Sequence, residues 1–273
     1  MSRRPSLQAR VDDYLAERRR QGFHLRSRDA FLSGFARFVE AKRHRGPLTA
    51  ELMVEWVRAS KHGHGDAGTW ARSWGRLRHF ICYLRQFEPD TEVPEASLFG
   101  PEPGRVAPHI YREDEIADLL AAARTLSPSG SLRPFTYETL FGLMASTGLR
   151  VSEAIHLRDA DVDLKRGMLT IRQTKFAKSR QLPIHPSTVK ALARYRKQRQ
   201  QHLPATVGMP FLIGNRGRRL GLPLGERQAH RVFTGLRDGL GWVNRGGHEA
   251  PRLHDLRHTF AVRRLMRWYA DGA

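Results

Sequence analysis

The sequence predicts a mainly α-helical protein that carries one small β-hairpin or three-stranded sheet and is divided into two domains. Apolar residues recur at helical spacing through most of the chain, and only 167–185 combines two β-rich runs. The segment "EPDTEVPEASLFGPEPGRVAP" cannot sustain a helix and indicates a linker. Because 273 residues exceed the usual size of one domain, we expect a helical domain over 1–90, a linker over 91–107 and a mixed α/β domain over 108–273.

Four helices are expected in the first domain. Gly22 is a plausible stop for the first of them, and Thr49 is a good N-cap for the third. The fourth is the most periodic, because one face gathers Trp70, Trp74, Leu77, Ile81 and Leu84. Packed together, these helices would form a small all-helical domain.

The fourth helix has a second, basic face. Arg72, Arg76 and His79 follow the same spacing on the side opposite Trp70. Such a face suits a helix that lies in a DNA groove, but it also describes an ordinary solvated face. The Gly-rich "SKHGHGDAG" before it predicts a loop near phosphates, with Lys61 as a candidate contact.

The second domain mixes both kinds of element. Helices are expected over 112–126, 135–147, 187–201, about 226–240 and from His254 onward. The runs "GMLTIRQT" and "SRQLPIH" flank "KFAK", an arrangement that predicts a hairpin. Lys178 in that hairpin is a further candidate DNA contact.

The charge of the chain favours a polyanionic partner. Lys plus Arg number 47 against 27 Asp plus Glu, which gives a net charge of +20. The surplus is spread along the chain and is dominated by arginine, which suits bidentate contacts with phosphate. Nucleic acid is therefore the first candidate partner, although a generally basic protein would look similar. No apolar run approaches a membrane span, so we expect a cytoplasmic, nucleoid-associated protein.

Cofactor motifs are missing from the sequence. There is no GxxxxGK[ST], no GxGxxG after a strand and no G-x-S-x-G elbow. Cys82 is the only cysteine, which excludes a disulfide framework and a Cys-based zinc site. Its apolar neighbours in "HFICYLRQ" predict a small buried core residue. No cofactor is expected.

Two histidines and an arginine near the C-terminus could bind either a metal ion or an anion. His254 and His258 are four residues apart, but the glutamate of H-E-x-x-H is absent and Arg257 intervenes, which disfavours zinc. His254 and Arg257 are three apart, so they share a helix face and could hold one anion together. By itself, H-x-x-R has little specificity.

Two longer segments accompany the H-x-x-R pattern of His254 and Arg257. "TGLRVSEAIHLRDADVDL" precedes the hairpin, and "HDLRHTFA" follows near the C-terminus. In this order and approximate spacing, the segments closely resemble the tyrosine recombinase family, also called the phage integrase family. The resemblance implies catalytic roles for Arg150, Lys175, His254 and Arg257, and supporting roles for Glu153 and His258. It also implies a core-binding (SAM-like) helical domain, followed by a mixed α/β catalytic domain.

The implied reaction fits these residue types. Two permanently charged guanidiniums, Arg150 and Arg257, can neutralise charge that develops on the non-bridging oxygens of a DNA phosphodiester. The resemblance implies that Lys175 protonates the leaving 5′ oxygen and that a tyrosine attacks phosphorus to form a 3′-phosphotyrosyl link. It further implies site-specific recombination or integration of a mobile element, including transposition, by a homo-tetramer on double-stranded DNA, without metal.

The expected nucleophile is not found where the family has it. Tyr269 follows Arg257 by twelve positions (269 − 257), which on one continuous helix is roughly 18 Å along the axis. Tyr269 is therefore not expected to be the nucleophile. The sequence predicts a chain that is truncated before that tyrosine and is inactive alone.

Two other functions stay open from the residues alone. One is a non-enzymatic DNA-binding remnant that regulates a mobile element. The other is an RNA-binding or ribosome-associated basic protein, in which the four candidate residues are scattered surface charges.

Overall fold

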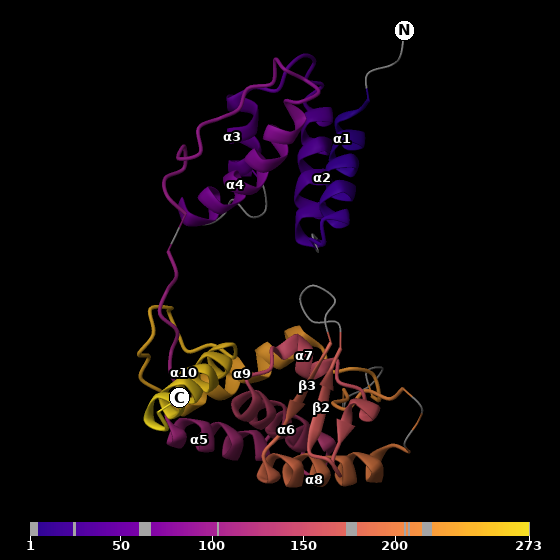
Figure 1. Cartoon of the computed structure of the whole chain (residues 1–273), viewed down its shortest axis with the longest axis vertical. Coiled ribbons are helices and arrows are strands. Elements are labelled where there is room, and N and C mark those ends of the chain that lie inside the picture. The colour runs from indigo at the N-terminus through magenta and orange to yellow at the C-terminus, as the bar shows by residue number, and fades with distance from the viewer. Residues whose placement is uncertain are drawn as a thin grey trace. The chain divides into compact units, whose positions relative to one another are not determined.

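The chain forms two compact units (Figure 1). Unit 1 is Met1–Arg105 and unit 2 is Val106–Ala273. The computed structural model describes residues 5–23, 26–59, 67–102, 104–172, 179–204, 206, 208–214 and 220–272.

Helices make up the regular structure of the described part of unit 1. These are α1 (Leu7–Arg20), α2 (Arg26–Ala41), α3 (Ala50–Ala59) and α4 (Ala67–Leu84). Ser6 caps α1 by accepting a hydrogen bond from the Ala9 amide at 3.2 Å, and Thr49 accepts from the Leu52 amide before α3. Trp74 of α4 is fully buried in the core that these helices share.

The outer face of α4 is the basic face predicted from Arg72, Arg76 and His79, and it is only partly exposed. Arg72 and His79 are exposed, while Arg76 is half-buried. Cys82, expected in the core, is exposed, so that prediction is wrong. The reason is helix phase, because Cys82 lies about 100° around the axis from the buried Ile81.

Part of the expected linker packs against α4. The Trp74 indole donates to the Glu95 carbonyl at 2.7 Å, and Arg78 donates to the Pro94 carbonyl at 3.0 Å. Phe99 packs edge-on against Trp74, with ring centroids 5.3 Å apart. The division between the two units falls after Arg105.

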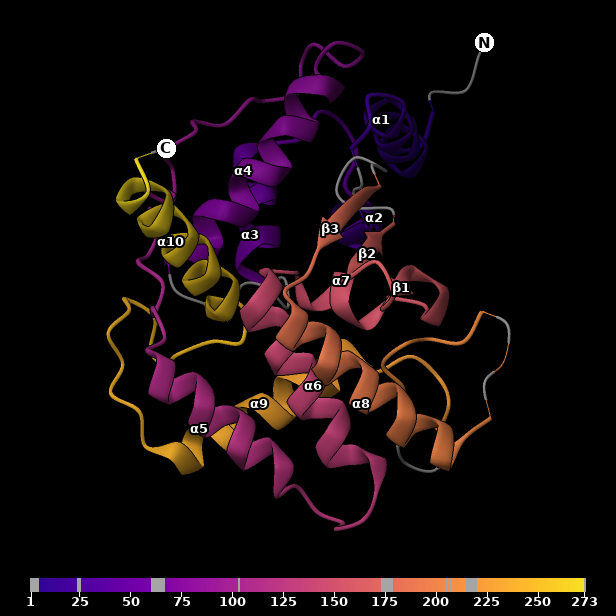
Figure 2. The same ribbon diagram turned by 60° about the horizontal axis from the view of Figure 1, so that its bottom comes forward.

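Unit 2 is built around α6 (Leu132–Thr147). This helix contacts α5 (Glu113–Arg124), α8 (Pro186–His202) and α10 (Asp255–Ala270) (Figure 2). The other helices of the described part are α7 (Val151–Ile155), the 3-10 turn η1 (Asp159–Asp161) and α9 (Glu226–Leu240).

A small antiparallel sheet lies beside these helices. Its strands β1 (Val162–Asp163), β2 (Met168–Ile171) and β3 (Arg180–Pro183) are in the order β1-β2-β3. The register pairs Ile171 with Arg180. Residues 173–178, between β2 and β3, lie outside the described residues.

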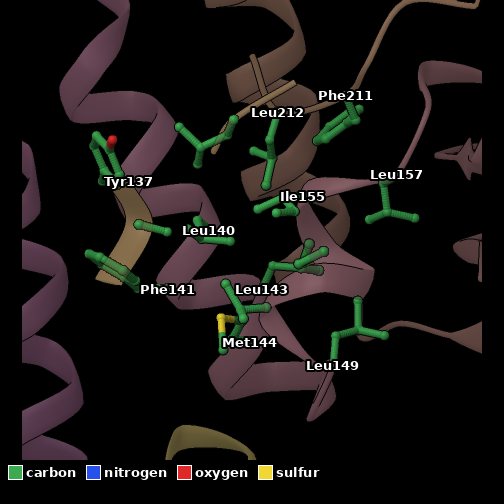
Figure 3. Close-up of a cluster of buried hydrophobic side chains, with 14 of the residues drawn as sticks. Tyr137, Leu140, Phe141, Leu143, Met144, Leu149, Ile155, Leu157, Phe211 and Leu212 are labelled. Atoms are coloured by element: carbon green, nitrogen blue, oxygen red, sulfur yellow. The ribbon is translucent and has the colours of Figure 1, made fainter. Parts of the chain in front are cut away.

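The core of unit 2 holds residues on both sides of the turn between α6 and α7. Leu140 and Met144 of α6, Leu149 and Ile155 are all buried, and Figure 3 shows them among Leu157, Phe211 and Leu212. Burying side chains of this size stabilises each by about 1.5–3 kcal/mol. The backbone between Leu149 and Ile155 is therefore fixed at both ends.

A buried ionic network joins the start of unit 2 to the loop before α10. Glu115 is 2% exposed and accepts from Arg245 Nη2 at 2.5 Å, while the His109 ring lies 3.4 Å away. Burial alone would raise the pKa of Glu115, but the hydrogen bonds from Arg245, the Arg112 amide and His109 outweigh it and lower that pKa to about 2.

Glu115→Gln should therefore destabilise unit 2 in a pH-dependent way. The folded pKa of about 2 lies below the ordinary 4.5, so the stabilisation is complete above pH 4.5 and is lost as the pH falls toward 2. We expect the variant to lose about 3 kcal/mol of unfolding free energy at pH 7, and much less at pH 3. Urea unfolding at both pH values measures this.

Asp114→Asn is the matched control, because the Asp114 side chain is 63% exposed. It should change the free energy of unfolding by less than about 0.5 kcal/mol. A loss in Glu115→Gln that is equal at pH 7 and pH 3 would contradict the assignment of the stabilisation to this carboxylate.

Candidate active site

Arg150 is held at the turn between α6 and α7. Gly148 ends α6 in the left-handed conformation, with φ at 65°, and Arg150 follows as the extended N-cap of α7. Its neighbours Leu149 and Val151 are buried. The Arg150 side chain is 41% exposed, so the buried neighbours fix its backbone while its guanidinium stays accessible.

Glu153 fixes that guanidinium from behind. It accepts from the Arg150 amide at Oε2 and from Arg150 Nη1 at Oε1, both at 3.0 Å. Burial alone would raise the pKa of Glu153, but the hydrogen bonds from the Arg150 amide and Arg180, together with the charge of Arg180, outweigh it and lower that pKa. Glu153 is therefore an ionised, buried anchor.

Arg257 reaches the same carboxylate from the other end of the chain. It lies in the first turn of α10, its Nη1 donates to the Gly148 carbonyl, and the same nitrogen is 4.0 Å from Glu153 Oε2. Burial and the neighbouring charge of Arg150 lower the pKa of Arg257. Two guanidiniums that repel each other are thus held together with only part of their charge compensated, an arrangement that favours an incoming anion.

His254 precedes α10 and is half-buried. Burial, followed by the nearby His258 and Arg257, lowers the pKa of His254 below 6.5, so the ring is mainly neutral at pH 7. The ring of His258 packs edge-on against it, with centroids 5.0 Å apart. Among the described residues, no group of three or more His, Cys, Asp or Glu side chains is arranged to hold a metal.

Sequence reasoning missed Arg180 at the start of β3. Its Nη2 is 3.0 Å from Glu153 Oε2 and its Nη1 is 3.3 Å from Oε1. The only sequence signal was an arginine at the start of a β-rich run, and that signal does not identify a partner 27 residues away.

The other predicted residues fall into three groups. Lys61, Lys175 and Lys178 lie outside the described residues. Arg72 and Arg76 belong to unit 1. Tyr269 is 83% exposed at the far end of α10, which runs unbroken from Asp255 to Ala270, so it lies roughly 18 Å along the axis from Arg257.

The fold and the cluster together indicate a class of protein that acts on phosphodiesters. Arginines from segments more than 100 residues apart converge on one buried carboxylate in a mainly helical, strongly basic chain. Such a cluster suits binding and activation of a phosphodiester. No helix in the described part of the chain has the length and apolar character needed to cross a membrane.

Comparisons with known proteins identify the family. The phage integrase family matches residues 110–270. Integrase/recombinase y4rB of Sinorhizobium fredii is 38% identical over 262 residues, which cover 95% of this chain and 82% of that protein. Tyrosine recombinase XerC of Rhodospirillum centenum is 31% identical, over 88% of this chain and 69% of XerC. The chain belongs to the phage integrase family, and site-specific DNA recombination is the function of that family.

Solved structures agree on the fold. The Tn1549 transposon integrase in complex with a circular intermediate DNA has a TM-score of 0.65 at 15% identity, covering 94% of this chain and 87% of that one. XerH recombinase bound to a palindromic difH substrate has a TM-score of 0.62 at 16% identity, covering 90% and 69%. The predicted fold class, mainly α with a small three-stranded sheet, is confirmed.

Proposed function

We propose that Arg150, His254 and Arg257, together with Lys175, activate one phosphodiester of double-stranded DNA for transesterification. The observation that carries this proposal is the convergence of Arg150 and Arg257 on Glu153. The two guanidiniums stabilise the charge that grows on the non-bridging oxygens, and the partial burial of Arg257 strengthens its share of that interaction. Neutral His254 is suited to accept or return a proton at the phosphate.

The reaction exchanges one phosphorus–oxygen bond for another. A tyrosine hydroxyl oxygen bonds to phosphorus and its proton passes to neutral His254, while the bond from phosphorus to the 5′ oxygen breaks. The 5′ oxygen leaves as a hydroxyl with a proton from Lys175, and the 3′ end stays attached to the tyrosine. Reversal of the step with another 5′ hydroxyl rejoins the strands, so no external energy source is needed.

Tyr269 is not the tyrosine in this proposal. Its exposed position on α10 is too far from Arg257 for both to contact one phosphate. Tyr111, Tyr137 and Tyr195, the other tyrosines of unit 2, are each 1% exposed in its core. The same observation favours a second function, in which the chain binds recombination sites without cutting them and so regulates a mobile element.

DNA is the proposed partner, with a homo-tetramer as the proposed assembly. XerH is solved bound to its difH substrate and λ integrase as a tetramer bound to a Holliday junction. The Tn1549 neighbour is a transposon integrase bound to a circular intermediate DNA, which supports transposition as the proposed process. The positive charge of this chain supports the same partner.

The test begins with a duplex selected from a random-sequence pool by the full chain. Cleavage is then measured with hydrogen peroxide as an added nucleophile, so the result does not depend on which tyrosine attacks. We expect cleavage at one defined phosphate by the wild type and none by Arg257→Ala. Failure to select a duplex, or peroxide cleavage that ignores Arg257→Ala, would refute the proposal.

The same duplex separates the two functions. A denaturation-resistant protein–DNA adduct that persists in Tyr269→Phe identifies another tyrosine, whereas loss of the adduct in that variant would refute our reading of Tyr269. Peroxide cleavage without any adduct favours the non-cutting regulator. A structured RNA that displaces the duplex at equal concentration would favour the RNA-binding alternative.

The outer face of α4 is the proposed DNA contact of unit 1. Replacing Arg72 and Arg76 by alanine should weaken duplex binding and lower the salt dependence by about one ion per lost phosphate contact. Cys82, the only cysteine and exposed near His79 on α4, should react more slowly with a maleimide when the duplex is bound. Salt titrations and intact-protein mass spectrometry measure these effects.

Arg124→Ala is the control in unit 2, because it removes one positive charge from a half-exposed side chain on α5 that pairs with Glu138 at 2.8 Å. Equal salt slopes for the control and the double variant, with unchanged alkylation of Cys82, would place the contact elsewhere.

A further inference from the structure

The hydrogen-bond capacity of Glu153 is completely used. A carboxylate offers about four acceptor sites. Two are taken by the amide and Nη1 of Arg150, each at 3.0 Å. Arg180 takes the other two, with Nη2 at 3.0 Å from Oε2 and Nη1 at 3.3 Å from Oε1. Arg180 therefore holds both oxygens with one planar fork.

This saturation leaves Arg257 without a hydrogen bond to Glu153. Its Nη1 is 4.0 Å from Glu153 Oε2, which is too long for a hydrogen bond, and it donates to the Gly148 carbonyl instead. Among the described residues, the Gly148 carbonyl is the only group that accepts a hydrogen bond from the Arg257 guanidinium. Its remaining donors are thus free for a ligand, and its side chain is 31% exposed.

Loss of Arg180 would change which arginine the carboxylate holds. Two acceptor sites on Glu153 would open, and Arg257 would need to move by only about 1 Å to fill them. In a half-buried site an arginine and a carboxylate attract each other strongly. Arg257 would then be neutralised and turned away from the phosphate.

We propose that Arg180 is a positioning residue that occupies Glu153 and thereby keeps Arg257 available for the scissile phosphate. The proposal rests on the proposed function, in which Arg257 contacts that phosphate. It differs from a direct role, because Arg180 acts here only through Glu153.

A double-mutant cycle distinguishes the two roles. Arg180→Ala should slow peroxide-supported cleavage of the selected duplex by about 30-fold, within the range seen when a charge-stabilising donor is disabled. Glu153→Gln should slow it less, because the amide oxygen still accepts from Arg150 but no longer attracts Arg257 as a charge. The double variant Arg180→Ala/Glu153→Gln should be faster than Arg180→Ala and within about threefold of Glu153→Gln.

Two further variants separate positioning from folding and from simple charge loss. Arg180→Lys should recover only part of the activity, because an ammonium lacks the planar fork. Arg166→Ala removes one positive charge from a side chain that is 85% exposed between β1 and β2, and it should cleave as the wild type does. If Arg180→Ala fails to fold, the comparison of Arg180→Lys with Arg180→Lys/Glu153→Gln replaces it.

Each outcome decides the matter. A double variant slower than Arg180→Ala would mean that Arg180 acts on the phosphate or on folding directly, and unchanged cleavage in Arg180→Ala would mean that it positions nothing. Either result overturns the inference. If Arg257→Ala itself cleaves normally, the proposed function fails instead.

Discussion

Arg150→Ala is expected to slow cleavage of the selected duplex by about 10²–10³-fold, the usual loss when one preorganised donor to a developing negative charge is removed. The reason is positional as well as electrostatic. The buried Leu149 and Val151 fix the backbone of Arg150, and Glu153 accepts hydrogen bonds of 3.0 Å from its amide and from Nη1 of its guanidinium. This group is therefore aligned before DNA arrives and costs no reorganisation during the reaction.

Arg150→Lys separates charge from geometry. It keeps the positive charge but loses the planar fork, so we expect most of the loss to remain. Duplex affinity should change far less than the cleavage rate, because the interaction strengthens as charge develops. Single-turnover rates and binding constants for both variants measure this.

Arg158→Ala is a local control, since Arg158 is exposed a few residues further along. Its rate should match the wild type. A parallel fall in affinity and rate for Arg150→Ala would instead indicate a contact that binds DNA without activating the phosphate.

Much of this site was predictable because its strongest signals are local. "TGLR" encodes a left-handed glycine and an N-cap, and "HDLR" places His254 and Arg257 at the start of one helix. The family resemblance implied catalytic roles in both segments. Arg150 and Arg257 both approach Glu153.

Arg180 was not predictable because its role depends on tertiary register. Residue spacing within a strand gives the alternation of faces, but it does not tell which distant carboxylate lies opposite the first residue of β3. Only the pairing of Ile171 with Arg180 and the packing of α7 bring Arg180 to Glu153. A buried ionised glutamate does require compensating donors, yet many arginines in this chain could have supplied them.

Two predictions about unit 1 were based on local composition, which does not give helix phase or tertiary packing. The apolar neighbours of Cys82 suggested burial, but on a helix the phase decides, and Cys82 lies off the face of Ile81 and Leu84. Proline and acidic residues indicated a linker, and the described residues between α4 and α5 form no helix. Irregular backbone can still pack, as the Trp74 hydrogen bond to Glu95 demonstrates.

Gly148→Ala is expected to damage folding and chemistry together. A Cβ at this position would clash with Cδ1 of Phe260 and lie 3.0 Å from its Cγ, at a φ of +65° that side chains disfavour. The left-handed conformation costs about 1 kcal/mol, and overpacking against the ring costs about 1–3 kcal/mol more. Denaturant unfolding should therefore show a loss of about 2–4 kcal/mol.

The chemical effect follows from the carbonyl of the same residue. Gly148 accepts from Arg257 Nη1, so a displacement of Gly148 or Phe260 moves Arg257 away from the phosphate. Gly241→Ala is the matched control, because Gly241 ends α9 at a φ of +62° with no atom near its Cβ position. It should incur only the conformational cost and keep wild-type cleavage. Adding Phe260→Ala to Gly148→Ala should remove the steric part, and an equal stability loss in Gly148→Ala and Gly241→Ala would show that the close approach to Phe260 has no energetic consequence.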